Sequence, residues 1–265
     1  MSERFYCTDN VYFLTDQDTI VHVERDDCTD SPRDWDNVGT LLLGDNSCLG
    51  KNEAGDMFPT WEGLLEHYGV EMSGHLGDDV RAVREAAKGL GDVVLPVSTY
   101  EHGGMEVYIG LPEDHFDGRW DCSFQGLIMA DKETIRENWG EGPDAYETAE
   151  NVLRGEIKDL DTWAQGEVYG YTEYNKMGEE IDACWGFYGD NPNENGISDS
   201  TGHIVEDLGE YLDIEECLED NAERLGIEID PLPSLSDRIH AAEGISEERN
   251  SAAAGVEKTE RDDAR

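Results

Sequence analysis

The sequence predicts an α+β fold, with antiparallel hairpins packed against several helices and a disordered acidic C-terminal tail. Short runs rich in β-branched and aromatic residues are separated by turn-forming residues, which is typical of hairpins. Longer segments carry apolar residues at helical spacing instead. The two kinds of segment do not alternate regularly, and this argues against a parallel sheet with crossover helices.

The expected strands form at least two hairpins. The first occupies residues 5–24, where Asp16 to Asp18 supply the turn. The later hairpin occupies 167–174 and 181–188. Between them lie an apolar run at 41–43, paired strands at 93–97 and 105–109, and a short strand at 127–129.

The clearest helix is expected from Pro143 to Gln165. Its apolar residues recur at steps of three and four: Tyr146, Ala149, Leu153, Ile157, Leu160 and Ala164. Pro143 suits a first helical turn, and Gly166 suits the stop. Further helices are expected near 60–68, 79–88, 131–139, 203–211 and 214–225.

We expect residues 1–235 to form a single globular α+β domain and residues 236–265 to form a disordered tail. The tail contains no aromatic residue, and its few apolar residues are scattered among charges, Ala and Ser. Such a segment buries too little apolar surface to offset the entropy of ordering it.

The charge balance is extremely acidic. Asp and Glu number 63 against 19 Lys and Arg, which gives a formal net charge of -44. Repulsion among so many like charges destabilises a compact state in ordinary salt. At about 1 M salt the Debye length falls to about 3 Å, which screens most of it. The acid surplus and the scarcity of Lys therefore predict halophilic adaptation. The alternative is a DNA mimic, but its acids would gather on one face, whereas these occur in every segment.

Other patterns bound the location and the partners. The chain has no apolar run of membrane-spanning length and no signal-peptide-like N-terminus, so we expect a cytoplasmic protein of a host cell. It has no basic patch for direct nucleic-acid binding. Its six cysteines are scattered without a CxxC pair, and we expect free thiols, mostly buried.

The first candidate site lies in residues 31–40. Asp34 and Asp36 are two positions apart, so on an extended chain both carboxylates face one side and suit a hard divalent cation. Trp35 and Asn37 are candidate binding residues beside them. The alternative is a capped turn that bonds backbone groups and is anchored by Trp35.

The second candidate site combines two later segments. His102, beside Gly103 and Gly104, is a candidate general base or ligand, with Asp121 as its catalytic partner. The alternative is that the two glycines only form the turn between the paired strands. Trp120 and Gln125 are candidate binding residues. We expect Asp36, His102 and Asp121 to lie in one pocket lined by Trp35 and Trp120, built either as a catalytic site or as a junction of the core. A nucleophilic pair of Cys184 with His102 is conceivable, but we expect Cys184 to be a buried, inert thiol.

Five ordered blocks resemble a family of tailed-phage and provirus proteins that has no assigned activity. They occupy residues 31–40, 95–104, 120–126, 163–171 and 182–189. Two positions depart from the family pattern: Gly103 replaces a Ser after His102, and Phe124 replaces a Gly between Ser123 and Gln125. Both changes argue against catalysis by a serine. The resemblance implies a viral or mobile-element origin, not a reaction.

Three functions follow as hypotheses. The first is an accessory protein of a haloarchaeal virus or provirus that contacts a host or viral protein in the host cytoplasm. The second is a small hydrolase or nucleotide-modifying enzyme that uses Asp36, His102 and Asp121, with a divalent cation as its possible cofactor. The third is a DNA-mimicking anti-defence protein.

We predict that the chain needs molar salt to fold. Circular dichroism during a KCl titration should show the native signal appearing only as the repulsion among its carboxylates is screened. A full native signal with an unchanged melting temperature at about 0.1 M KCl, where the Debye length is about 10 Å, would contradict halophilic adaptation.

Overall fold

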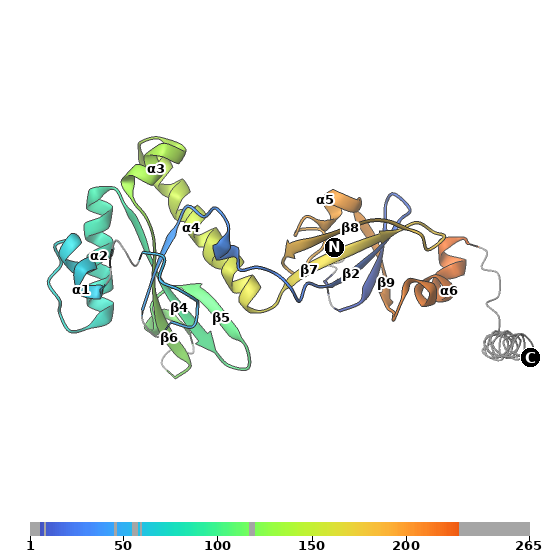
Figure 1. The fold of residues 1–265 in the computed structure, drawn as a ribbon, viewed down its shortest axis with the longest axis horizontal. Coiled ribbons are helices and arrows are strands. Elements are labelled where there is room, and N and C mark those ends of the chain that lie inside the picture. Colours follow the sequence, from blue (N-terminus) through green and yellow to red (C-terminus); the bar gives the residue numbers. More distant parts are fainter. Residues whose placement is uncertain are drawn as a thin grey trace, which may run out of the picture. The chain divides into compact units, whose positions relative to one another are not determined.

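A computed structural model shows two antiparallel sheets and confirms the α+β class (Figure 1). The structure describes residues 6–7, 9–44, 47–54, 58, 60–116 and 120–227. The chain divides into two compact units, Met1–Leu212 and Asp213–Arg265. The tail expected at 236–265 lies outside the described residues, and the single domain over 1–235 stays a prediction.

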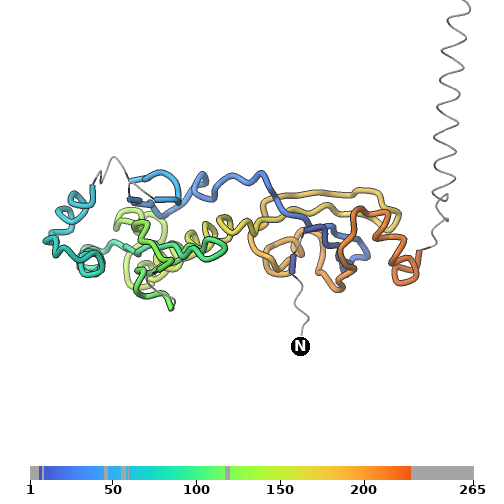
Figure 2. The backbone as a smooth tube through the Cα atoms, turned by 90° about the horizontal axis from the view of Figure 1, so that it is seen from below, coloured from blue at the N-terminus to red at the C-terminus, as the bar shows by residue number. Residues whose placement is uncertain are grey.

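The first sheet joins strands that are far apart in the sequence. Its order is β8-β7-β2-β1-β9. The hairpin of β1 (Val11–Thr15) and β2 (Ile20–Arg25) lies between the later strands, as Figures 1 and 2 show by colour. The second hairpin, β7 (Val168–Tyr174) and β8 (Glu180–Tyr188), pairs through β7 with β2. Both expected hairpins are confirmed.

The helix expected at 203–211 is wrong, because this segment is strand β9 (Ile204–Glu210), paired with β1. Its buried apolar residues, Ile204 and Leu208, are four positions apart. Four residues are two strand periods and also nearly one helical turn, so the spacing fits both structures. Pairing with β1, almost 200 positions away in sequence, decides between them.

One face of this sheet holds an apolar core. Phe13 and Val21 lie directly opposite each other in the register and are fully buried. Tyr169 and Tyr171 of β7 join the same cluster, and Ile197 of the short helix α5 (Ile197–Thr201) packs with them.

The second sheet has the order β3-β6-β4-β5. Its strands are β3 (Thr40–Leu43), β4 (Val93–Glu101), β5 (Met105–Ile109) and β6 (Cys122–Ala130). β6 is much longer than the strand expected at 127–129, because its N-terminal half pairs with the C-terminal half of β4. Chain reversal between β4 and β5 occurs at the expected glycine pair, where Gly103 has a φ of 81°.

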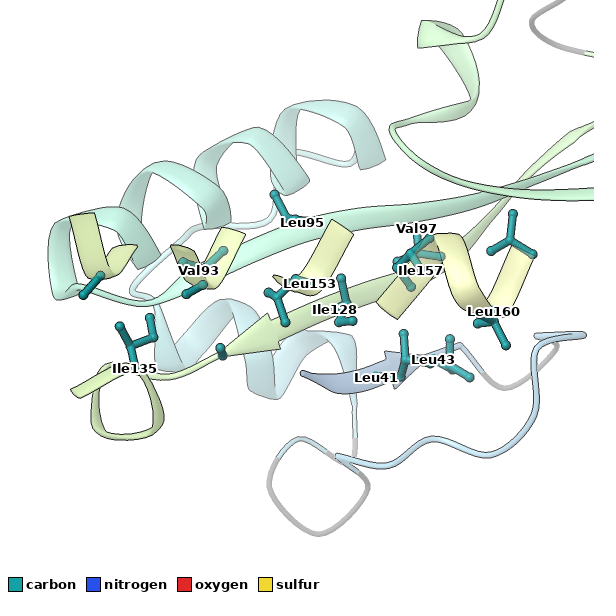
Figure 3. Packing of buried hydrophobic residues seen from close by; sticks show 14 residues of the cluster. Leu41, Leu43, Val93, Leu95, Val97, Ile128, Ile135, Leu153, Ile157 and Leu160 are labelled. Carbon is teal, nitrogen blue, oxygen red and sulfur yellow. The ribbon is translucent and has the colours of Figure 1, made fainter. Parts of the chain in front are cut away.

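Helix α4 (Pro143–Ala164) covers one face of the second sheet and confirms the clearest helix prediction. Leu153, Ile157 and Leu160 point toward the strands, as Figure 3 shows. Helix α3 (Lys132–Trp139) contributes Ile135 to the same cluster.

Helices α1 (Trp61–His67) and α2 (Leu76–Leu90) pack on the opposite face of this sheet. Leu42 and Leu127 belong to this second cluster, whereas their sequence neighbours Leu41 and Ile128 belong to the α4 cluster. The alternation explains why the apolar run at 41–43 is continuous, since both faces of the strand are covered.

Helix α6 (Ile214–Leu225) belongs to the second unit and begins as expected. The side chain of Asp213 accepts a hydrogen bond from the amide of Glu216, and Gly226 ends the helix in a left-handed conformation.

A buried ion cluster fixes the segment between strands β2 and β3. Arg33 lies in a short 3-10 turn (Pro32–Asp34) that Ser31 caps. Its guanidinium contacts Glu53 at 2.7 Å and Glu156 at 2.8 Å. The side chains of Arg33 and Glu156 are only 8% and 11% exposed. Glu156 also accepts hydrogen bonds from the amides of Val38 and Gly39, at 2.7 and 3.1 Å. One carboxylate thus satisfies a buried cation and two backbone donors.

We predict that Arg33→Met destabilises the fold by about 3 kcal/mol, because removing one partner of a buried ion pair leaves an uncompensated buried charge. Arg154→Met is the matched control. Arg154 pairs with Glu150 at 2.6 Å on the exposed face of the same helix as Glu156, where such a pair is worth about 0–1 kcal/mol. Urea unfolding in molar KCl measures both, and equal losses would mean that the Arg33 cluster is not a structural anchor.

Candidate functional site

His102 and Asp121 meet at one end of the second sheet. The Nδ1 atom of His102 lies 3.0 Å from Oδ2 of Asp121. A backbone hydrogen bond of 2.8 Å from the Glu101 amide to the Asp121 carbonyl holds the two segments together. The His102 side chain is 72% exposed. The two residues predicted to act as a catalytic pair are therefore in contact, on an open surface.

One aromatic ring connects His102 with a second histidine. The ring of Tyr100 stacks on His102 with centroids 6.0 Å apart, and on His115 with centroids 4.4 Å apart. His115 also lies 3.8 Å from Glu106 on β5. A carboxylate that orients an exposed imidazole can support proton transfer. Within the described residues, the His102 ring forms no hydrogen bond to a Ser, Thr or Cys side chain, so no nucleophile is paired with it there.

Asp36 does not complete a metal-binding group with this pair. Among the residues that the structure describes, which include all three, no three His, Cys, Asp or Glu side chains gather closely enough to hold a metal ion. The strand register gives the reason: Thr40 lies opposite Met129, at the end of β6 remote from Asp121. The expected metal site of Asp34 and Asp36 likewise has no third ligand among the described residues.

The segment at 31–40 forms the capped turn that was its alternative interpretation. Ser31 accepts a hydrogen bond from the Arg33 amide, and the Asn37 side chain donates to the carbonyls of Pro32 and Trp35, each at 2.9 Å. Asn37 therefore closes the turn. Trp35 is exposed rather than anchored in a core, and its ring meets the edge of Tyr188 with centroids 5.3 Å apart.

Two other predicted binding residues have different surroundings. Gln125 is buried and hydrogen-bonded at both ends of its amide: its oxygen accepts from Ser47 and from the Cys48 amide, and its nitrogen donates to Thr99 at 2.8 Å. It joins a loop to the sheet and borders a cavity of about 380 Å³. Trp120 is 93% exposed, so the described residues do not enclose its ring in a pocket.

The cysteines are free, as expected, but most are not buried. Only Cys7 and Cys217 are buried; Cys28, Cys48 and Cys184 are exposed. The prediction of a buried Cys184 is wrong, because neither face of this part of β8 is covered and its neighbours on the strand are exposed as well. The Cys184 thiol lies near the carbonyl of its neighbour Trp185, and the described contacts do not pair it with His102.

Sequence reasoning missed the exposed edge of the first sheet. β8 ends the sheet, and seven of its nine residues are exposed. Two large apolar side chains lie on it, Ile181 at 54% and Trp185 at 47% exposure. An aromatic, β-rich run resembles a buried strand, and the sequence carries no signal of its place in the strand order.

The ring of Trp185 lies directly on Gly170 of β7. A Cβ atom at Gly170 would overlap the ring, so only glycine leaves room for it. The two residues are cross-strand partners. A register shift at Gly186, whose φ is 89°, marks a bulge next to Trp185, and a bulge bends the strand locally.

Comparison with known proteins finds no match among family models, curated proteins or solved structures. The likeness of the five motif blocks to a phage family therefore stays a prediction. Within the described part of the chain, no helix has the length and apolarity needed to cross a membrane.

We predict that His22 makes the fold sensitive to mild acid. His22 stacks on Tyr12 with centroids 4.4 Å apart, and burial lowers its pKa despite the nearby Glu24. A folded-state pKa below the unfolded one means that the unfolded chain binds the proton more tightly. Stability is then complete above about pH 6.5, the unfolded value, and falls as the pH drops toward the folded pKa.

The measurement is the free energy of unfolding in urea between about pH 7.5 and 5.5, across the ordinary His pKa. His22→Gln should reduce the slope, and exposed His203→Gln should leave it unchanged. Parallel curves for wild type and His22→Gln would refute the assignment.

Proposed function

We propose that the protein is an accessory protein of a haloarchaeal virus or provirus, and that it acts in the host cytoplasm by binding another protein through β8. The observation that carries the binding mode is an edge strand of nine residues, exposed over most of its length and bearing Ile181 and Trp185. The acidic composition supports a halophilic setting, and the motif blocks support the viral origin.

An edge strand presents unpaired amide and carbonyl groups that another extended chain can pair with. Proteins commonly block such edges with Lys or Pro, and β8 has neither. The stretch from Asp182 to Trp185 pairs with β7 without a register shift, so its outer groups form a regular row. The Ala183 amide donates to the Asp182 carboxylate at 2.9 Å, which caps one donor locally. A partner strand would replace that contact and extend the sheet by β-augmentation.

The test uses a cellulose array of nine-residue peptides in which Thr and Val alternate, with one guest residue varied at each position. The full chain, fluorescently labelled, is applied in molar KCl. Ala183→Pro removes the outward amide without removing a hydrogen bond to β7, and should abolish binding. Ala183→Ser keeps the amide and should still bind. Thermal melting confirms that both variants fold. Binding that survives Ala183→Pro, or no binding by wild type, would overturn the proposal.

A second candidate function is a hydrolase or nucleotide-modifying activity in which His102 is the base. The 3.0 Å contact between His102 and Asp121 favours it. His102→Gln separates the two functions, because the proposed binding strand lies in the other sheet and should keep its peptide binding in that variant.

A further inference from the structure

A single row across the first sheet places a carboxylate beside the exposed indole. Glu24 of β2 pairs with Gly170 of β7 in a regular register, and Gly170 pairs with Trp185 of β8. The missing Cβ of Gly170 would point at the Trp185 ring, so the ring and the Glu24 side chain share one face. The row therefore runs from carboxylate to aromatic ring to open sheet edge.

Glu24 lacks a counter-ion among the described residues. The two basic residues of the neighbouring strands and turn are engaged elsewhere: Arg25 with Asp9 at 3.0 Å, and Lys176 with Asp18 at 3.0 Å. His22 lies two positions away on the same face, but burial lowers its pKa, so it is neutral at neutral pH. Among the described residues, no positively charged side chain pairs with the partly exposed Glu24 carboxylate, and none stacks on the Trp185 indole.

We propose that the Trp185 ring and the Glu24 carboxylate together bind a Lys or Arg side chain of the strand that pairs with β8. The inference rests on the proposed function and names its partner class, an extended segment carrying a cationic residue opposite Trp185. The indole face attracts a cation, and the carboxylate accepts hydrogen bonds from its head group.

The distances favour arginine. A partner residue opposite Trp185 would lie three strand spacings, or about 14 Å, from the backbone of Glu24. An Arg side chain laid flat over the indole and the Glu24 side chain together bridge that span, and the planar guanidinium stacks on aromatic rings. Lys is shorter and is strongly hydrated, so we expect it to bind more weakly than Arg.

The short range of the interactions made by Glu24 and Trp185 also explains how an acidic protein would select a partner in molar salt. Its net charge of -44 attracts any cation at low ionic strength. At about 1 M salt the Debye length is about 3 Å, so the diffuse field contributes little and contact-distance interactions remain. The Glu24 and Trp185 pair offers such a contact at a defined place.

The same peptide array tests the inference with Arg, Lys, Gln or Glu as the guest residue at each position. When the guest residue is at a central peptide position, wild type should bind the Arg peptide about tenfold more tightly than the Gln peptide. This ratio is in the range expected for a cation over an indole beside a carboxylate. Lys should lie between them, and Glu should bind least.

Glu24→Gln and Trp185→Leu should reduce the preference for Arg over Gln to about twofold or less, with neutral peptides still bound. Glu180→Gln is the matched control, because it removes the same charge from β8 outside the row. Trp185→Phe keeps an aromatic face and should retain part of the preference.

The outcomes separate the two proposals. If all guest peptides bind with equal affinity and Ala183→Pro abolishes this binding, the cation site is overturned and the edge-strand function is supported. Equal loss of the Arg preference in Glu24→Gln and Glu180→Gln would also overturn the cation site, because diffuse charge would then explain it. Absence of binding to every peptide would overturn both.

Discussion

The buried cluster of Arg33, Glu53 and Glu156 is the constraint on which the second sheet depends. Glu156 lies on α4, and it binds both the guanidinium and the amides of Val38 and Gly39 just before β3. Glu53 binds the same guanidinium and the Leu41 amide. The cluster thus connects the incoming chain, the edge strand β3 and the covering helix. Gly39 is packed so closely against Leu153 and Ile128 that a Cβ atom would lie 2.5 Å from Leu153. A charge taken out of water is tolerated only when such partners surround it.

This constraint changes the meaning of the most distinctive motif. The Ser31–Thr40 block carries acids, an amide and an indole, which together suggest a ligand site in the sequence. In the structure, its Arg is the central residue, Asn37 closes the turn, and Ser31 caps it. Asp34 and Asp36 are the acids of a capped turn rather than members of a metal-binding group among the described residues. A block of unusual composition can therefore serve the fold alone, because a short turn that carries a buried cation needs specific partners at several positions.

Local patterns predicted the elements better than their arrangement. The stripe from Tyr146 to Ala164 predicted α4 because one helix face encodes its own periodicity. The contact of His102 with Asp121 was expected only as a meeting of motif blocks, since it depends on Tyr100 pairing with Cys122 across β4 and β6. The exposure of β8 could not be predicted, because its composition is that of a covered strand and its edge position follows from pairings across some 150 residues. The strand β9 was predicted as a helix for a related reason: its spacing is ambiguous, and only its distant partner β1 decides.

The two exposed constellations differ in what the surrounding structure supplies. His102 has an orienting carboxylate but, among the described residues, neither a hydrogen-bonded nucleophile nor a metal-binding group, and it stands in open solvent. Proton transfer there would require a substrate that is held in the reactive geometry by groups other than these two residues. At β8, by contrast, the sheet already fixes the backbone row, and the Trp185 ring lies against Gly170. A partner strand would lose less conformational entropy on a rigid template than on a mobile loop. Preorganisation therefore favours a binding function at β8 over chemistry at His102, although the histidine pair has the more familiar catalytic residues.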